Sequence, residues 1–242
     1  KEYKPYTGDT ILLEELPETV AIYTWGRGED GQLGLGDTND QHVPVLVDAL
    51  SDAGHARGGS TVKQISCGSG HTVILDQKGQ VFTWGRGDDG RLGHGDNGGK
   101  DVPRAVEALA GKTITQVTCG SYHTAAVSES GELFTWGGGM YGKLGHGDEN
   151  GHAVPVRVSA LRDVSVLQVA CGSRHTVVLT ADMSVFSWGD KENGVSGHSP
   201  GEMDGHQYAP RIVAGLRGVN CTQVAACGFH TAALSETGEI YT

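Results

Sequence analysis

Short apolar runs, each bounded by turn residues, dominate the pattern of hydrophobic and polar positions along the chain. One unit contains such runs at 62–68, 71–75, 81–85 and 103–109, with glycine-rich or charged turns between them. Runs of this length that are rich in valine, isoleucine and threonine are typical of β-strands. No long segment shows the 3.6-residue period of a helix. The pattern predicts an all-β protein with four short antiparallel strands in each unit.

The unit is repeated along the chain, as two independent landmarks show. Tryptophan recurs at positions 25, 84, 136 and 188, and a His-Thr pair begins at positions 71, 123, 175 and 230. The spacing of both landmarks lies between 52 and 59 residues. A period of this size with four strands in each unit predicts the stacked blades of a β-propeller.

The repeated strings resemble those of the regulator-of-chromosome-condensation repeat family. The resemblance rests on WGRGEDGQLGLGD at 25–37 and CGSRHT at 171–176, which recur in phase from about Val20 to Thr242. It implies a seven-bladed ring of four-stranded blades. We expect Leu33, Leu92 and Leu144 to fill the space between neighbouring blades, and the repeated tryptophans to pack in a similar way.

The 242 residues hold only part of such a ring, because seven units of ~52 residues would need about 364. We expect about four to four and a half repeats in residues 20–242, after an irregular lead-in over residues 1–19. The repeats open with the third and fourth strands of a unit, at Val20–Trp25 and Pro44–Leu50. Missing blades or a second copy would complete the ring. In the alternative, strands at 222–226 and 230–235 pair with the first ones and close a ring of four blades.

Three repeated motifs have a chemical as well as a structural interpretation. Gly-x-Gly-x-x-Gly at 26–31, 85–90 and 137–142 fits a dinucleotide fingerprint, but no helix follows to hold a pyrophosphate. Cys-x₃-His at 67–71, 119–123 and 171–175 supplies only two of the four ligands that zinc needs. We expect the cysteine position to be packed, since Ala226 takes this place in the last unit, and the histidine to bond to a backbone group.

Asp37, Asp96 and Asp148 each follow a Gly-x-Gly string. One carboxylate in each unit is a poor supply for calcium, which takes 6–8 oxygens. We expect these side chains to cap turns through Asx-type hydrogen bonds. No cofactor, no metal and no catalytic residue is predicted for the chain.

Two irregular loops, at 51–61 and 198–208, interrupt the regular repeat, and the fourth unit has lost its Gln-Leu-Gly core at 188–197. Irregular loops on a regular scaffold often carry specific function. In the alternative, these loops have simply drifted, because loops tolerate insertions well. On the functional interpretation, we predict that a partner contacts the charged residues and histidines of these segments: His55, Arg57, Asp190, Lys191, Glu192, His198, Glu202, Asp204 and His206.

Composition narrows the class of partner. With 18 basic and 29 acidic residues the net charge is −11, which repels nucleic acid and anionic lipid and favours a protein partner. No stretch approaches the ~20 apolar residues of a membrane span. Five cysteines, an odd number, do not suggest a disulfide framework and favour a reducing compartment, the cytosol or the nucleus.

These observations predict a non-catalytic protein-interaction scaffold, as one domain of a larger regulatory protein. The family resemblance implies three alternatives: a guanine-nucleotide exchange factor for a Ran-like small GTPase, a substrate-recruiting arm of a ubiquitin ligase, and an ultraviolet-B photoreceptor. The photoreceptor signature is Gly-Trp-Arg-His-Thr. Here the tryptophan of that signature is replaced by Ser69, Ser121, Ser173 and Gly228, and only 172–176 keeps the arginine.

Overall fold

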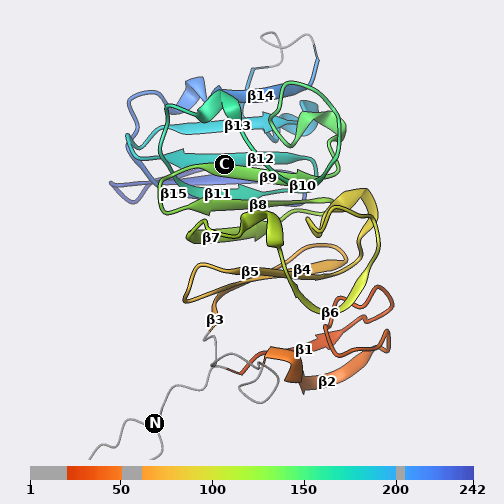
Figure 1. Ribbon diagram of the computed structural model, residues 1–242. Helices are drawn as coiled ribbons and strands as arrows, with labels where there is room; N and C mark the ends of the chain where they lie inside the picture. Colours follow the sequence, from red (N-terminus) through yellow and green to blue (C-terminus); the bar gives the residue numbers. More distant parts are fainter. Residues whose placement is uncertain (1–20, 51–61, 200–204) are drawn as a thin grey trace, which may run out of the picture.

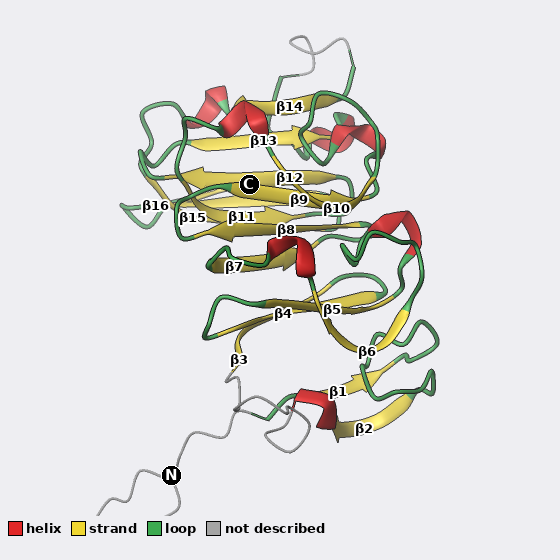
Figure 2. Ribbon diagram, in the orientation of Figure 1, coloured by secondary structure: helices red, strands yellow, loops and turns green. Residues whose placement is uncertain are grey.

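The computed structural model describes residues 21–50, 62–199 and 205–242 as a curved stack of five antiparallel sheets (Figures 1 and 2). We number these sheets as blades in chain order. The first blade contains β1 (Tyr23–Gly26) and β2 (Gln41–Leu46). The next three are complete: β3 (Val62–Cys67), β4 (His71–Asp76), β5 (Val81–Gly85) and β6 (Lys100–Ala105); β7 (Ile114–Cys119), β8 (His123–Ser128), β9 (Leu133–Gly137) and β10 (His152–Arg157); β11 (Val166–Cys171), β12 (His175–Thr180), β13 (Val185–Gly189) and β14 (Gln207–Ile212). The fifth contains β15 (Cys221–Cys227), β16 (His230–Ser235) and β17 (Ile240–Tyr241).

Short 3-10 helices connect the strands in place of longer helices. They are η1 (Asp48–Leu50), η2 (Asp88–Gly90), η3 (Glu107–Leu109), η4 (Met140–Gly142), η5 (Ser159–Leu161), η6 (Glu192–Gly194) and η8 (Ala214–Leu216).

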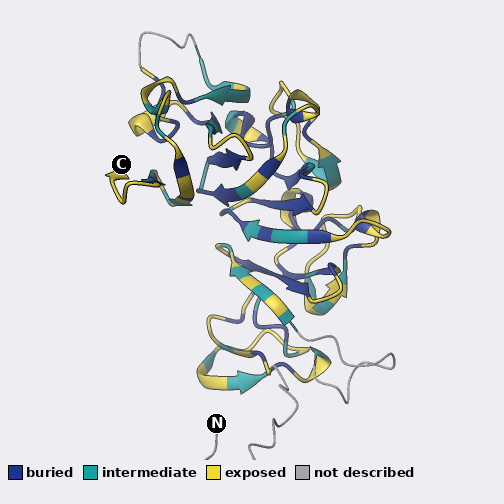
Figure 3. Cartoon of the chain, turned by 90° about the vertical axis from the view of Figure 1, so that its left-hand side faces the viewer, coloured by how far each residue is buried: buried dark blue, intermediate teal, exposed yellow. Residues whose placement is uncertain are grey.

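The blades form an incomplete propeller, as the sequence predicts. The first strands of successive blades, β3, β7, β11 and β15, contact one another, so they lie nearest the axis of the arc. The two incomplete blades lie apart at the two ends of the arc and pair only within their own sheets (Figures 1 and 3). The alternative ring of four blades is therefore wrong for this structure. The second strands of the three complete blades, β4, β8 and β12, are buried along their whole length.

The predicted fourth strand of each unit is wrong in its bounds. In the second blade β6 begins at Lys100 and ends at Ala105, and Glu107–Leu109 forms η3 instead of continuing the strand. The first blade shows the same shift, with β2 at Gln41–Leu46 followed by η1. A proline such as Pro103 is tolerated because β6 is an edge strand, where a missing N–H removes no ladder bond. The 3-10 turn places Leu109 in the core, where it is 4% exposed.

A threonine, a histidine and a loop carbonyl join the second, third and fourth blades each to the next blade. Thr124 of the third blade donates its hydroxyl hydrogen to the carbonyl oxygen of Arg91 in the second blade, at 2.8 Å. The Nε2 atom of His71, also in the second blade, lies 2.9 Å from the same hydroxyl oxygen. His123 with Thr176 and His175 with Thr231 repeat the contact at 2.9 and 2.8 Å. The partner of the histidine is thus a side chain of the next blade, rather than the predicted backbone group.

This contact fixes the protonation of the histidine. The single hydroxyl hydrogen of the threonine is used by the carbonyl, so the histidine Nε2 must carry a hydrogen and donate it. The other ring nitrogen, Nδ1, is buried without a hydrogen-bond partner in His71, His123 and His175. A second proton would therefore have no acceptor, and burial lowers the pKa of His71 to about 3 and of His175 to about 4. Burial also lowers the pKa of His123 well below its usual range.

A glutamine on the first strand of a blade forms a second link. The side-chain amide of Gln64 donates to the carbonyl of Val117 at 2.9 Å and accepts from the N–H of the same residue at 3.0 Å. Gln116 makes the same pair of bonds to Val169. The amide therefore replaces a backbone ladder between strands that do not belong to one sheet.

The repeated tryptophans pack against the glycine of the preceding blade. Trp84, Trp136 and Trp188 are fully buried, and the indole N–H of Trp84 donates to the carbonyl of Gln32 at 2.9 Å. A Cβ on Gly34 would lie 2.7 Å from that indole nitrogen, so no other residue fits there. Trp25 is the exception at 61% exposed, because no preceding blade covers it in the described part of the chain. Leu33, Leu92 and Leu144 are buried, as predicted.

The register of the last blade confirms the prediction for the cysteine position. Cys67, Cys119 and Cys171 each pair with the threonine of the next strand, and in β15 it is Ala226 that pairs with Thr231. Cys119 and Cys171 are buried, and burial raises the pKa of the Cys171 thiol to about 12. Cys119 and Cys171 therefore act as small packed residues, as predicted, whereas the prediction is wrong for Cys67, which is exposed.

We predict that Trp136→Ala lowers the free energy of unfolding by about 3–5 kcal/mol, because it leaves a cavity at a blade boundary. Urea unfolding followed by circular dichroism measures the change. Trp25→Ala is the matched control and should cost less than about 1 kcal/mol, since the Trp25 side chain is largely in solvent. Equal losses in the two variants would contradict the packing role.

We also predict that stability falls as pH drops from about 6.5 to 5. The unfolded chain takes up protons on histidine in this window, whereas His71, His123 and His175 stay neutral when folded. Each histidine then removes about 1.4 kcal/mol of stability per pH unit. Urea midpoints between pH 7.5 and 5 measure the slope, and His123→Asn should make it shallower. A flat profile would mean that these histidines are not buried neutral.

Candidate functional site

One end of each blade carries two loops that together form a face of the arc. The first loop joins the first and second strands and includes Tyr122, Arg174 and Phe229, each directly before the repeated histidine. The second loop joins the third and fourth strands and begins after the repeated Trp-Gly pair. Because the blades repeat, equivalent residues of these loops lie side by side on this face.

The repeat changes at the third blade. In the first two blades, the residue after Trp-Gly is an arginine that pairs with an acid two positions on, Arg27 with Glu29 and Arg86 with Asp88. In the third blade, Gly138 and Met140 take the places of this arginine and acid. The backbone is unchanged, since Gly138 N–H donates to Tyr122 O as Arg86 N–H donates to Gly70 O. The loss of the long arginine side chain therefore leaves space without altering the fold.

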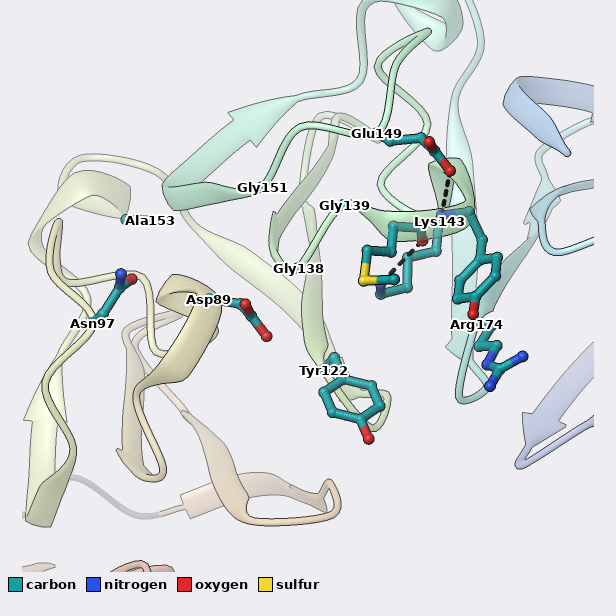
Figure 4. Close-up of a pocket in the computed structure, with 12 residues that line it drawn as sticks. Asp89, Asn97, Tyr122, Gly138, Gly139, Lys143, Glu149, Gly151, Ala153 and Arg174 are labelled. Atoms are coloured by element: carbon teal, nitrogen blue, oxygen red, sulfur yellow. Dashed lines mark hydrogen bonds between the residues drawn. The ribbon is translucent and has the colours of Figure 1, made fainter.

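That space is a cavity of about 640 Å³ on the loop face, between the second, third and fourth blades (Figure 4). In Figure 4, Asp89 and Lys143 lie on opposite sides of Gly138. The residues that line it are Asp89, Asn97, Tyr122, Gly138, Gly139, Met140, Tyr141, Lys143, Glu149, Gly151, Ala153 and Arg174.

Aromatic and aliphatic side chains stay exposed around this cavity. Tyr122 is 47% exposed, Met140 63% and Phe229 49%. The guanidinium of Arg174 lies between two rings, 4.6 Å from the centroid of Tyr141 and 5.3 Å from that of Phe229. Exposed aromatic residues beside arginine are the usual composition of energetic centres in protein interfaces.

Tyr141 occupies a strained backbone position. Its φ is +66°, and the equivalent residues Asp89 and Asn193 have φ of +59° and +56°. Aspartate and asparagine tolerate this region because their short side chains bond locally, whereas tyrosine does not. The Tyr141 ring contacts Arg174 and lies edge-on to His206 at 4.9 Å between centroids. Strain of this kind is often found at functional sites.

Two buried cations lie against the Tyr122 ring, and one of them, Lys143, lines the cavity. Arg91 and Lys143 are each 2% exposed, and both lie within 6 Å of the Tyr122 ring centroid, at 5.1 and 5.9 Å. Arg91 pairs with Asp89 at 3.3 Å and donates to the carbonyls of Asp88 and Ser121. Lys143 donates to the carbonyl of Met140 at 3.1 Å. Burial lowers the pKa of the Lys143 ammonium to about 8.

Asp190 continues the change of repeat into the fourth blade, where it stands in the place of Arg27, Arg86 and Gly138. Its side chain is 1% exposed and lies 3.4 Å from Arg174 Nη1 and 3.3 Å from His206 Nδ1. It also accepts the N–H of Glu192 at 3.0 Å. The buried carboxylate thus holds Arg174 beside the cavity and joins the irregular loop to the fourth blade.

The structure brings only some of the predicted partner-binding residues together. Asp190, Glu192 and His206 gather around Arg174, and the exposed Lys191 follows directly in the chain. His198 lies apart, 7% exposed, with its Nε2 3.1 Å from Ser187 Oγ. His94 and His146 make the same contact in the preceding blades, so His198 is a member of the repeat. His55, Arg57, Glu202 and Asp204 lie outside the described residues.

Sequence reasoning missed the central residues of the cavity, Tyr122, Met140, Tyr141 and Lys143. The predicted residues lie in irregular segments, whereas these four lie in loops of regular length. The signal is present in the repeat itself, where Gly-Gly-Met-Tyr at 138–141 replaces Arg-Gly-Asp-Asp at 86–89. Three charged side chains are lost there, and an aliphatic one and an aromatic one are gained.

The other chemical motifs have structural roles. Asp37, Asp96 and Asp148 accept the N–H of Asn39, Gly98 and Asn150 at 2.8–3.0 Å, which confirms the predicted turn caps. The second and third Gly-x-Gly-x-x-Gly strings end in the three-residue turns η2 and η4. Across residues 21–50, 62–199 and 205–242, no three histidine, cysteine or acidic side chains converge to hold a metal ion. In the same residues, no helix is long and apolar enough to cross a membrane.

Comparison with known proteins places the chain among propellers of one kind. The family model described as RCC1-like domain matches residues 16–242. The chain is 39% identical over 228 residues to the E3 ubiquitin-protein ligase HERC2 of Mus musculus, covering 93% of this chain and 5% of the ligase. It is 36% identical over 222 residues to the ultraviolet-B receptor UVR8 of Arabidopsis thaliana, covering 92% of this chain and 48% of the receptor. The chain thus spans about half or less of these relatives.

Solved structures agree on the fold. Human WBSCR16 matches with a TM-score of 0.76 and 26% identity, over 91% of this chain and 55% of that one. Prp20p from Saccharomyces cerevisiae, which was studied for its binding to Gsp1p and histones, matches with a TM-score of 0.78 and 24% identity, over 93% of this chain and 53% of Prp20p.

We predict that Arg174→Ala lowers the free energy of unfolding by about 1–3 kcal/mol, because it removes the cation beside the buried carboxylate of Asp190. Arg86→Ala is the control. Arg86 pairs with Asp88 in solvent, and loss of such a pair costs at most about 1 kcal/mol. Urea unfolding measures both changes, and a loss at Arg174 no larger than that at Arg86 would contradict the anchoring role.

Proposed function

The chain belongs to the RCC1-like domain family, and on this premise we propose that it is a non-catalytic protein-interaction domain of a longer protein, which binds its partner through the cavity of the third blade. The relatives support the general class, since they include ubiquitin ligases and a receptor of which this chain matches only a part. The cavity opened by the change of repeat at Gly138 and Met140 is the reason to propose this surface as the binding site. A rigid propeller with one break in its symmetry offers a partner one distinct place to bind.

The composition of the cavity supports protein rather than small-molecule recognition. The cavity is open to the loop face and lined by Tyr122, Met140 and Arg174, which are partly exposed, and the exposed Phe229 ring lies beside Arg174. Side chains of these types dominate the binding energy of protein interfaces, provided that surrounding contacts exclude water. A role in partner binding also explains why Tyr141 is held at a strained backbone position.

Within this class, recruitment of a protein to a ubiquitin ligase is the finer proposal. Two of the relatives, HERC2 and the probable ligase HERC6 of Homo sapiens, are named as E3 ubiquitin-protein ligases, and the identities are 39% and 33%. Exchange activity on a Ran-like GTPase stays a prediction, because likeness to Prp20p at 24% identity concerns the fold alone. A nucleotide-release assay on such a GTPase decides it.

Light reception has less support, despite the 36% identity to the ultraviolet-B receptor. Trp84, Trp136 and Trp188 are fully buried at separate blade boundaries, where they pack against glycine. The equivalents of the signature tryptophans include Ser121 and Ser173, whose hydroxyls lie 2.8 Å apart.

The expected cytosolic or nuclear compartment stays a prediction as well.

We predict that Gly138→Arg removes partner binding without harming the fold. A Cβ at Gly138 meets Asp89 and Tyr122 O at 3.4 Å, an ordinary contact, and its φ does not require glycine. The arginine restores the side chain of the first two blades and fills the cavity. Proteins captured by the wild-type chain and by the variant are compared by quantitative mass spectrometry, and a subset should fall at least tenfold.

Gly215→Arg is the matched control. Gly215 lies in η8, in the loops at the opposite end of the blades, and a Cβ there meets nothing within 4 Å. This variant should keep all partners. Identical capture by Gly138→Arg and the wild type would show that the cavity is not the binding surface.

A further inference from the structure

Lys143 differs from Arg174, which also lines the cavity, and from the neighbouring Arg91 in having no carboxylate partner. Arg91 pairs with Asp89 and Arg174 with Asp190, whereas Lys143 forms no ion pair within 4.0 Å in the described part of the chain. Its ammonium has three hydrogens to donate. One is donated to the carbonyl of Met140, the hydrogen bond that the structure shows for this group.

Burial of this ammonium without a counter-charge is unfavourable for the fold. Lys143 is 2% exposed and lies against the Tyr122 ring rather than against an acid. A buried charge needs pairing or full hydrogen bonding to offset the loss of water. Because Lys143 lines a cavity that opens to the loop face, the missing negative group can come from outside the chain.

We propose that the cavity of the third blade binds a carboxylate side chain of a partner protein, paired with Lys143 and flanked by an apolar residue on Tyr122 and Met140. This inference rests on the proposed function and names the chemistry of the partner. A single carboxylate balances the single unpaired ammonium. The apolar neighbour follows from the exposure of Tyr122 and Met140, 47% and 63%.

The rim of the cavity argues for a carboxylate rather than a phosphate group. Asp89 and Glu149 line the cavity, and both raise the pKa of Lys143 from a distance without pairing with it. Their negative charge repels a dianion more strongly than a monoanion. The net charge of −11 adds a general repulsion against polyanions such as nucleic acid.

The equivalent space between the first and second blades does not have this chemistry. Four acids line it, Glu29, Asp30, Asp88 and Asp101, with two cations, Arg86 and Lys100. An excess of carboxylates disfavours an acidic ligand there. The third blade replaces Asp88 by Met140 and Asp101 by Ala153, so the acceptance of a carboxylate is specific to one place on the arc.

The test is a selection of random dodecapeptides displayed on phage against the wild-type chain, Lys143→Met and Gly138→Arg. Peptides enriched on the wild type and lost from both variants should contain aspartate or glutamate beside a large apolar residue. For one such synthetic peptide, exchange of the acid for its amide should weaken binding at least tenfold by fluorescence anisotropy. Lys143→Met should weaken binding to a similar extent, and Lys143→Arg less.

The unfolding midpoint separates this role from a structural one. Lys143→Met should unfold at or above the wild-type urea concentration, because it replaces an unpaired buried charge by an apolar side chain of similar size. A clear loss of stability would indicate that Lys143 supports the fold and would overturn the assignment.

Other outcomes distinguish this inference from the proposed function. If peptides are lost from Gly138→Arg but bind Lys143→Met within twofold, the face binds protein without a carboxylate, so the inference fails and the proposed function stands. Equal binding of the amide peptide has the same meaning. If no peptide distinguishes the wild type from Gly138→Arg, the cavity is not a peptide site and the inference is wrong.

Discussion

From the second boundary on, each blade boundary of the described chain depends on one threonine hydroxyl, which receives a histidine N–H and gives its own hydrogen to a loop carbonyl of the same preceding blade. At the second boundary these groups are Thr124, His71 and Arg91 O. Much of the repeated sequence follows from this junction. A Cβ on Gly68 would lie 2.6 Å from the His71 ring, so the residue before the turn must be glycine. The histidine must stay neutral, because its second nitrogen meets no acceptor.

The junction also explains how the cavity can exist without loss of the bonds between blades. Hydrogen bonds of the Thr-His-carbonyl set and of the Gln64 and Gln116 amides lie inside the blade boundaries. The side chains after Trp-Gly, by contrast, lie in the loops at the end of the blades and take no part in these bonds. Gly138 can therefore stand in place of an arginine while its backbone keeps the bond to Tyr122 O. Scaffold and recognition surface are set by different positions of the same repeat.

The sequence predicts the fold well, because blade contacts are repeated and a period is easy to detect. Tryptophan, histidine and leucine positions all indicate buried contacts, and the structure confirms this for Trp84, Trp136 and Trp188. The outer strand was placed too late in the chain, since apolar residues such as Leu109 continue past its end in a 3-10 turn. Periodicity alone does not separate that turn from a strand.

The site was harder to predict than the fold. The sequence predicts the site in irregular segments because they break the regular repeat. Of the predicted residues, Asp190, Glu192 and His206 do lie beside the cavity. The cavity itself arises from a substitution at constant length, at Gly138 and Met140, and from an aromatic residue at a strained position, Tyr141. The cavity becomes visible only when side chains of three blades are compared on one face. These side chains lie together only in the folded chain.

The Thr-His-carbonyl junction has a further consequence for the history of such chains. From the second boundary on, one blade presents a histidine N–H donor and a carbonyl acceptor. The next blade presents a threonine hydroxyl that bonds to both, and these contacts are nearly identical from boundary to boundary. Any blade can therefore follow any other without a change at the seam. Duplication, loss or exchange of a whole blade leaves matching contacts at the blade boundaries. A new surface can therefore be inherited as a single exchangeable blade.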